Sequence, residues 1–554
     1  MAAHIAIQKS PLLVQALFKH TEEHRTRKMA QLYKHGRDID QSKGTLLFWV
    51  PGGMPLLLHV EASIAAAMKL RGYDVHAIIC NAPYRGCAIR TVQEGVPIAK
   101  WRDACLTCTR KTSAVLEQMG IPYSYNGDFL TDAERDELWQ STADVTWDTL
   151  DTLSYNGLNV GKNVRSSVVR YLQGAALTGH EAIVREYAYS GLVSACAAAR
   201  ALDRFNPWRV FMSHGTYIDW GPAIHTAFER GIPVTGWKAS YLSWHFYLRH
   251  VEDPSRIDFK KLSRACWEDI RSRELSPREN ARLDKFFEDR YHRQISFDMK
   301  HIKTYRQDVS ELKKKYAPTD KPVFAVLAHI NWDSVSDYAP MAYPSFDDWM
   351  IDTIRHAIEI PDVQWLIKIH PIEAWDNPAS GVQRLIEREF PELPDHVRVI
   401  PAEEDISPAN MFELIDGGVT VYGTAGLELA LMGKPVILAG EAHYGGLGFA
   451  HEGMTPITYR RFLKGASRLG RLTDQQRRDV RKYAYSHFIQ RQIPLEIVHD
   501  PRTEWWGLQH EKRELLLPGK DAFIEFVCDR LVDGRDFNMT EDLVALSERE
   551  VGAA

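Results

Sequence analysis

The sequence predicts an α/β protein built from two doubly wound domains, and three observations support this prediction. The chain has 554 residues, enough for two to four domains of about 100–200 residues each. Hydrophobic residues make up 45% and charged residues 25%, the balance of a folded soluble protein, which excludes disordered, collagen-like and coiled-coil classes. Apolar strand patterns alternate with helical patterns in two separate series, one beginning at Thr45 and the other at Pro322.

The first series covers residues 44–249 and predicts an N-terminal Rossmann-like domain, preceded by a polar helical arm over residues 1–43. From Thr45, the apolar run TLLFWVPGG stops at Pro-Gly-Gly, as buried parallel strands do. A helix closed by Gly72 and the strand DVHAIICNAP complete a βαβ unit. After Pro207, the strand WRVFMSH, a helix and the strand IPVTGW predict a second unit.

The second series covers residues 321–475 and predicts a C-terminal Rossmann-like domain with the strands VFAVLAH, VQWLIKIHP and GGVTVYG. Residues 250–320 are charged and predict a helical connector, and residues 476–554 predict a helical tail. Parallel sheets of this kind bind ligands outside the carboxyl ends of their strands. Two such domains facing each other therefore place a cleft between them.

Charge and targeting signals limit the classes of partner. There are 68 Lys and Arg residues against 73 Asp and Glu residues, a net charge of −5, so we expect no nucleic-acid partner. The start of the chain has no apolar run followed by a small-residue cleavage site, and no stretch approaches the ~20 apolar residues of a spanning helix. The protein is expected to be cytoplasmic and to touch a membrane only peripherally.

The first candidate ligand-binding motif is Ile367-Lys368-Ile369-His370-Pro371, at the end of an apolar strand. Alternate side chains of a strand share a face, so Lys368 and His370 are expected to point the same way. The imidazole can donate a hydrogen bond to a phosphate oxygen at a position where ligands bind. The alternative is a histidine that is hydrogen-bonded inside its own loop.

The second motif runs from Val421 to Glu428, where a strand passes through small residues into a helix. Unpaired N–H groups and the helix dipole favour a phosphate there, Thr424 can cap the helix, and Glu428 can accept hydrogen bonds from ribose hydroxyls. The alternative is a tight packing turn whose glycines only provide space. Neither a dinucleotide fingerprint nor a P-loop occurs, so nicotinamide chemistry and P-loop hydrolysis are not supported.

The order of these motifs resembles one family. A strand ending in His-Pro is followed by a small-residue turn, a helix containing Glu428, the run GKPVI and the loop His443-Tyr444-Gly445-Gly446-Leu447-Gly448. This order, with the loop Ala328-His329-Ile330-Asn331-Trp332-Asp333, is similar to capsular polysaccharide biosynthesis and export glycosyltransferases of GT-B type. The resemblance covers about residues 320–460 well and the first half weakly, through Pro51-Gly52-Gly53 and Ser213-His214-Gly215.

The resemblance implies a glycosyltransferase of surface polysaccharide synthesis, with a nucleotide-sugar donor in the C-terminal domain and the acceptor in the N-terminal domain. His-Pro is often associated with CMP-activated acidic sugars, and a lipid-linked acceptor would bring the enzyme to the inner face of the membrane. The donor-binding residues it implies are Asn331, Lys368, His370, Pro371, Gly423, Thr424, Ala425, Gly426, Glu428 and Tyr444.

A general base is expected to face the donor from the first domain, and the candidates are His214, Asp219 and Glu61. The structural alternatives are a histidine bonded to its turn and an aspartate that caps a helix. No metal or organic cofactor is needed, because a helix dipole and cationic groups can stabilise the leaving phosphate.

Four cysteines, Cys80, Cys87, Cys105 and Cys108, fall within one short span, and the last two form a C-x₂-C pair. This spacing suits a structural zinc site, and the alternative is a set of reduced, partly buried thiols.

Two other functions remain open from the sequence. One is a nucleotide-sugar epimerase or polyol-phosphate transferase on the same frame. The other is a non-catalytic sugar-binding assembly protein.

Overall fold

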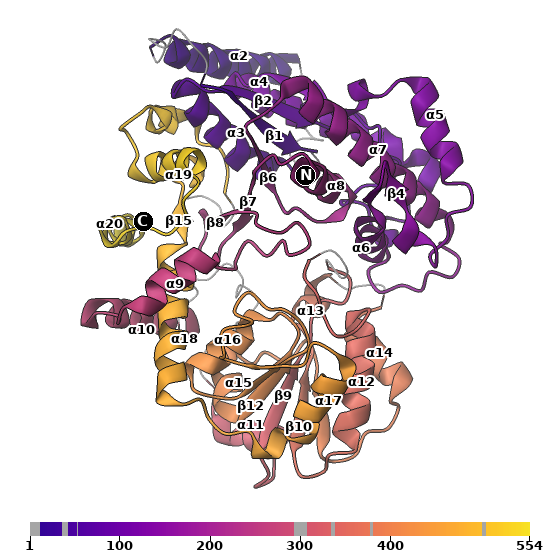
Figure 1. Ribbon diagram of the computed structural model, residues 1–554, viewed down its shortest axis with the longest axis vertical. Helices are drawn as coiled ribbons and strands as arrows, with labels where there is room; N and C mark the ends of the chain where they lie inside the picture. The colour runs from indigo at the N-terminus through magenta and orange to yellow at the C-terminus, as the bar shows by residue number, and fades with distance from the viewer. Residues whose placement is uncertain are drawn as a thin grey trace.

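The computed structural model describes residues 12–35, 43–51, 54–292, 307–333, 338–376, 380–500 and 506–553. Two α/β domains lie one above the other in Figure 1, with the N-terminal domain at the top and the C-terminal domain at the bottom. The predicted α/β class with two Rossmann-like domains is confirmed by the strand orders given below. No helix in these ranges is long and apolar enough to cross a membrane.

The N-terminal sheet has the strand order β15-β8-β7-β6-β1-β2-β3. Its strands are β1 (Thr45–Val50), β2 (Asp74–Ile79), β3 (Tyr123–Tyr125), β6 (Arg209–Ser213), β7 (Val234–Ala239), β8 (His245–His250) and β15 (Ile493–Pro494). The five strands from β3 to β7 run parallel, and β8 and β15 pair antiparallel. This order places β1 at the centre of the five parallel strands, and helices cover both faces of the sheet.

The continuous apolar run of β1 is explained by burial on both faces of the sheet. Leu46, Phe48 and Val50 pack on one side with α3 (Pro55–Leu70), whereas Leu47 and Trp49 pack on the other side with α7 (Ala182–Phe205) and α8 (Tyr217–Glu229). The remaining elements of this half are α2 (Leu12–His35), α4 (Cys105–Met119), α5 (Asp132–Ser141), α6 (Gly161–Leu172) and the small hairpin of β4 (Ser154–Tyr155) and β5 (Leu158–Asn159).

The C-terminal sheet is fully parallel, with the order β11-β10-β9-β12-β13-β14. Its strands are β9 (Val323–Leu327), β10 (Gln364–Lys368), β11 (Val397–Ile400), β12 (Gly417–Thr420), β13 (Val436–Leu438) and β14 (His451–Glu452). The chain leaves β9 toward β10 on one side and reaches β12 on the other, so the strand order reverses there. Sheets of this topology bind ligands at that reversal.

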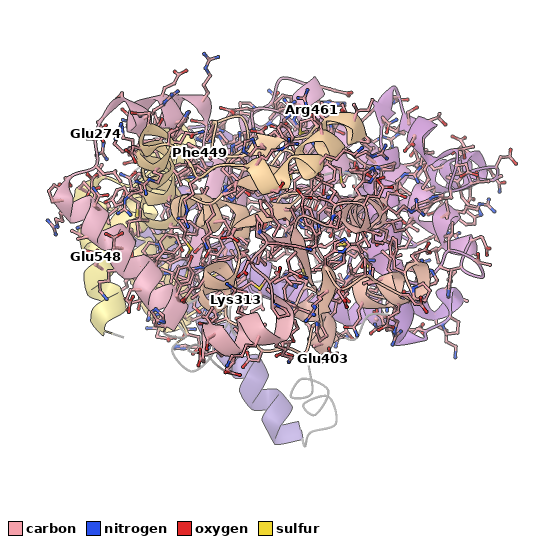
Figure 2. All side chains as sticks on the ribbon, turned by 90° about the horizontal axis from the view of Figure 1, so that it is seen from below. Glu274, Lys313, Glu403, Phe449, Arg461 and Glu548 are labelled. Atoms are coloured by element: carbon pink, nitrogen blue, oxygen red, sulfur yellow. The ribbon has the colours of Figure 1, made fainter. Side chains whose placement is uncertain are left out.

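Helices cover both faces of the C-terminal sheet. One face carries α12 (Phe346–Ile358), α14 (Val382–Glu389) and α17 (Pro456–Lys464), and the other carries α11 (Val309–Tyr316), α15 (Pro408–Leu414), α16 (Thr424–Leu431) and α18 (Asp474–Tyr485). In Figure 2, which looks from below, Lys313 on α11 and Arg461 on α17 lie on opposite sides of the domain. The short helix α13 (Ile372–Asp376) follows β10.

The connector and the tail both cross the junction between the domains. Helices α9 (Arg264–Ser272) and α10 (Pro277–His292) lie beside α18 at the left of Figure 1. After α18 the chain returns upward, where β15 pairs with β8 and α19 (Ala522–Asp533) packs on α3. The last helix is α20 (Glu541–Ala553). The N-terminal sheet is therefore completed by a strand from the segment that was predicted to be only helical.

Candidate active site

A cavity of about 340 Å³ opens at the carboxyl ends of β9, β10 and β12, where the strand order reverses. Predicted donor-binding residues line it, namely Lys368, His370, Pro371, Gly423, Thr424, Ala425 and Glu428. Tyr241, Lys260 and Arg290 line it from outside the C-terminal sheet, and Met411 and Phe412 of α15 add an apolar wall. The cavity therefore lies between the domains and has a charged end and an apolar wall.

His370 is oriented by the backbone that follows it. The N–H of Ile372 donates to Nδ1 of His370 at 3.2 Å, so the proton of the neutral ring resides on Nε2. The alternative from the sequence, a histidine bonded inside its own loop, is therefore correct for Nδ1. The proton on Nε2 makes that atom a hydrogen-bond donor, and the His370 side chain lines the cavity.

His329 is a cavity residue that the sequence analysis quoted only as part of a loop. Its Nε2 accepts from the backbone N–H groups of Val421 and Tyr422 at 3.2 and 3.1 Å, and its ring stacks on Phe346. Burial, together with the neighbouring His370, lowers the pKa of His329 to about 3. A neutral imidazole thus fixes the turn that leads from β12 into α16.

The turn before α16 departs from the prediction at Thr424. Gly423 is the N-cap residue, and Thr424 begins the helix without capping it. The Thr424 hydroxyl instead lies 2.8 Å from the Tyr241 hydroxyl and accepts from Lys260 Nζ at 3.4 Å. Because this side chain is held across the domain junction, it is not available to cap its own helix.

Gly426 and Tyr444 pack against this turn and stabilise it, and neither residue borders the cavity. The Tyr444 hydroxyl donates to the carbonyl of Gly423 at 2.8 Å, and a Cβ atom at Gly426 would collide with that hydroxyl. Gly426 therefore provides space for the Tyr444 hydroxyl, which is the packing role that the sequence analysis left as an alternative.

Glu428 is buried and has protein partners on both carboxylate oxygens. Arg290 donates to Oε1 at 3.2 Å and Tyr291 donates to Oε2 at 2.7 Å, both from α10. The side chains of Glu428 and Arg290 are each 4% exposed. The carboxylate expected to meet a ribose thus also anchors the connector helix to α16.

Lys368 shares the cavity with His370, as strand alternation predicts, yet its ammonium is already bound. Nζ donates to the carbonyls of Pro401 and Glu404 at 2.9 and 3.2 Å. Burial lowers its pKa to about 8. Lys368 therefore fixes the loop after β11 and adds positive charge behind it.

The three candidate bases of the N-terminal domain differ in their surroundings. Glu61 accepts from the N–H of Ser213 and from Trp237 Nε1, and burial raises its pKa to about 8. His214 stacks on Trp220, and burial lowers its pKa to about 4. Asp219 accepts from the N–H of Ala88 at 2.9 Å, and burial raises its pKa to about 6.

Asp219 borders a cavity in the N-terminal domain. This second cavity, about 50 Å³, lies at the carboxyl ends of β1, β2 and β6 and is also lined by Pro51 and Trp220. Gly52 and Gly53, which belong to the predicted motif beside it, lie outside the described residues.

The four clustered cysteines line this second cavity, but they do not form the predicted zinc site. Among the described residues, no three His, Cys, Asp or Glu side chains form a group that could hold a metal ion. Burial raises the pKa of Cys80 and Cys87, which favours the protonated thiol, whereas zinc binds the thiolate. No disulfide links any of the seven cysteines.

Residues 267–468 match the family model of the capsule polysaccharide biosynthesis protein. This match confirms the resemblance predicted from the sequence for that segment. The capsule-synthesis segment, residues 267–468, contains every lining residue of the first cavity except Tyr241 and Lys260. Glu61, His214 and Asp219 lie before it in the chain.

The chain is also similar to solved structures. A β-Kdo 2,4-transferase, KpsC from Thermosulfurimonas dismutans, is 18% identical with a TM-score of 0.33, covering 56% of this chain and 86% of that chain. The β-Kdo 2,7-transferase of the same organism's KpsC is 12% identical with a TM-score of 0.32, covering 61% and 88%. Alr3699/HepE from Anabaena, in complex with UDP and glucose, is 12% identical with a TM-score of 0.26, covering 80% and 94%.

These TM-scores are too low to assign an activity to this chain. No curated protein matches the chain.

A third predicted donor residue of the capsule-synthesis segment, besides Gly426 and Tyr444, does not border the cavity, and the loop that holds it joins the domains. Asn331 donates to Asp347 Oδ1 at 2.7 Å and does not border the cavity. Two residues further on, Asp333 accepts from Arg170 at 3.2 Å and from Tyr217, both in the N-terminal domain. The Ala328–Asp333 loop thus ties the capsule-synthesis segment to α6 and α8.

The raised pKa of Glu61 predicts a pH-dependent stability that Glu61→Gln should remove. The native state keeps a proton at Glu61 up to about pH 8, whereas the unfolded chain releases it near the ordinary value of 4.5. The contribution of Glu61 to stability is thus present below about pH 4.5 and is lost as the pH rises through 8. In thermal melts from pH 5 to 8, Tm of Glu61→Gln minus wild-type Tm should rise.

The matched control is Glu137→Gln, at an exposed position of α5. Its difference from wild type should stay flat over the same pH range. Parallel wild-type and Glu61→Gln curves would contradict the burial effect.

Proposed function

We propose that this protein is a glycosyltransferase that moves a sugar from a nucleotide-sugar donor to a glycan or lipid-linked acceptor in surface polysaccharide synthesis. The observation that carries the proposal is the 340 Å³ cavity, where His370 and the start of α16 lie together at the carboxyl ends of the strands. Membership of residues 267–468 in a capsule polysaccharide family supports it.

The donor is proposed to lie with its phosphate against the start of α16 and Nε2 of His370. The first N–H groups of an α-helix lack the regular partner four residues earlier, and the helix dipole favours negative charge there. In α16 the Gly426 N–H donates to the Gly423 carbonyl at 3.0 Å. The apolar wall of Met411 and Phe412 offers a surface for the nucleobase. The resemblance favours a CMP-activated acidic sugar as the donor.

The transfer step requires an acceptor hydroxyl to attack the anomeric carbon while the bond to the donor phosphate breaks. The electron pair goes to the phosphate oxygen, and preorganised positive groups stabilise that charge. His370, Lys260 and Arg290 provide those groups from three separate elements. The acceptor proton passes to a base of the N-terminal domain.

Asp219 is proposed as that base. Its pKa of about 6 leaves it ionised at neutral pH, whereas Glu61, with a pKa of about 8, keeps its own proton. It also borders the second cavity, which we propose as the acceptor side.

Thermal melts with CMP, CDP, UMP, UDP and GDP test nucleotide binding. A ligand that binds only the folded state adds about 2.7 kcal/mol at 100 times its Kd, so at least one nucleotide should raise Tm by several degrees. The same nucleotide-sugar should then support transfer to a glycan primer. Unchanged Tm with the whole panel would contradict the proposed donor site.

A further inference from the structure

Arg170 lies in the last turn of α6 and contacts three segments that are far apart in the sequence. Its Nε atom donates to the carbonyl of Ala88 at 2.8 Å. Its Nη1 atom donates to Asp333 Oδ1 at 3.2 Å and to the Tyr217 hydroxyl at 3.4 Å, and the guanidinium carbon lies 5.1 Å from the centre of the Tyr217 ring. One side chain therefore joins the segment after β2, the start of α8 and the Ala328–Asp333 loop.

Ala88 connects Arg170 to the proposed base. Its carbonyl accepts from Arg170, and its N–H donates to Asp219 Oδ2 at 2.9 Å. Ala88 and Asp219 both line the second cavity, whereas Arg170 lines neither the first cavity nor the second. Arg170 thus reaches the carboxylate through one residue and stays outside the space in which we propose that the acceptor binds.

Asp333 connects Arg170 to the donor side. It lies in the same loop as His329, which lines the first cavity and accepts from two backbone N–H groups of the turn before α16. Tyr217 also donates to Asp333. The loop therefore contacts the donor turn through His329 and the N-terminal domain through Asp333.

The backbone that presents Tyr217 is strained. The φ angles of His214, Gly215 and Tyr217 are 55°, 73° and 60°, in the left-handed region that bulky side chains rarely adopt. Such conformations persist where the surrounding contacts hold them, and they are concentrated at functional sites. Tyr217 is 3% exposed, and its hydroxyl donates to Asp333 across the domain junction. The strained turn therefore serves to place that hydroxyl.

The charges around these contacts are balanced. Arg170 pairs with Asp333, whose side chain is 50% exposed, so this ion pair adds little to stability. Burial raises the pKa of Asp219 to about 6, and the Ala88 N–H and the Arg170 cation act against that rise. The other described titratable groups that interact with Asp219 stay protonated and neutral at pH 7, because burial raises their pKa: Cys80, Tyr84, Cys87 and Tyr187.

We propose that Arg170 is a positioning residue that fixes the Asp219 carboxylate relative to the donor cavity by joining Ala88 to Asp333. A displacement of about 1 Å between reacting groups can cost a factor of about 100 in rate, so a link of this kind affects the transfer step. This inference rests on the proposed function and adds to it residues that do not touch the substrate.

Steady-state kinetics of Arg170→Met test this role with the nucleotide-sugar and the glycan primer that wild type uses. We expect kcat to fall about 10- to 100-fold. The nucleotide Kd from calorimetry should change by less than about threefold, because Arg170 does not border the first cavity. The acidic limb of the pH profile of kcat/KM should move up by about 1 unit, since the cation no longer favours ionised Asp219.

Two further variants separate charge from position. Arg170→Lys keeps a cation, so the acidic limb should stay near that of wild type. A single ammonium cannot reproduce the separate Nε and Nη1 contacts, so kcat should remain lowered. Tyr217→Phe removes one hydrogen bond to Asp333 and keeps the ring, so it should lower kcat without moving the limb.

The matched control is Arg165→Met. Arg165 lies on the same helix, pairs with Asp151 at 3.2 Å and stacks on Trp147. This variant should match wild type in kcat, in nucleotide Kd and in its pH profile.

Hydrogen exchange gives a readout that does not depend on the reaction. In Arg170→Met, amide exchange should become several-fold faster in peptides covering residues 86–90 and 328–333, because each segment loses a contact. Peptides from β11 should exchange as in wild type. Thermal melts establish that each variant is folded.

The outcomes separate this inference from the proposed function. If wild type transfers sugar and Arg170→Met keeps kcat and the pH profile, the positioning role is overturned and the proposed function stands. Full recovery of kcat in Arg170→Lys, or an equal fall in Arg165→Met, also overturns it. If wild type neither binds a nucleotide nor transfers sugar, the proposed function fails together with the positioning role, and unchanged exchange would overturn the link between the two loops as well.

Discussion

Replacing His370 by alanine is expected to weaken nucleotide binding by about 10- to 100-fold and to lower transfer at least as much. The N–H of Ile372 occupies Nδ1, so the ring presents Nε2–H to the proposed phosphate. A hydrogen bond to a charged group contributes about 1.5–3 kcal/mol, and 1.4 kcal/mol corresponds to a factor of ten in affinity. Calorimetry with the nucleotide that stabilises wild type measures the loss directly.

Two further variants make the His370 result specific. His370→Gln can present an amide N–H near the position of Nε2 and should recover part of the affinity. His180→Ala, at a partly exposed histidine that lines neither cavity, should bind like wild type. Wild-type affinity in a folded His370→Ala protein would show that this imidazole does not bind the phosphate.

Arg290→Met is expected to be the most destabilising of the proposed changes, at about 3–5 kcal/mol. It removes the cation from a pair whose two side chains are each 4% exposed. The Glu428 carboxylate then stays buried and keeps the Tyr291 hydroxyl, but no longer Arg290, as a hydrogen-bond donor. Removing one partner of a buried ion pair costs this much because the other charge stays buried and uncompensated. Urea unfolding followed by fluorescence measures the shift in the transition.

The double variant Arg290→Met/Glu428→Gln decides whether the cost comes from the unpaired charge. It should be destabilised by less than the sum of the two single variants, with a coupling of about 1–3 kcal/mol. The exposed pair of Arg264 and Glu268 provides the control, and Arg264→Met should cost less than about 1 kcal/mol. Additive single effects would show that the Arg290–Glu428 contact contributes little.

Local patterns were sufficient to predict the sheets and the turn of the cavity. The run from Thr45 to Val50 and the strand that ends at Lys368 are buried on both faces, so their apolar content alone identifies them. The position of His370 follows equally from local sequence, since a parallel strand that ends in His-Pro places the imidazole at the ligand edge of the sheet.

The residues that the sequence could not identify are those placed by long-range packing. Arg290 lies in a charged helix that the sequence marks only as a connector, and it becomes a cavity residue because α10 packs over α16. Lys260 and Tyr241 are brought to Thr424 by the junction between the domains. No spacing rule reports such contacts. The spacing of the cysteines predicted a zinc site, but spacing does not report burial. Burial raises the pKa of Cys80 and Cys87 and so favours the protonated thiol over the thiolate that zinc binds.

The return of the chain to its first domain affects how the protein can fold during synthesis. The β15 strand and α19 cover the edge and one face of the N-terminal half, yet the ribosome makes them only after the whole C-terminal domain. The apolar side of α3 therefore stays uncovered until translation is nearly finished. A nascent chain of this topology has to shield that side with a chaperone or tolerate it in a loosely packed intermediate.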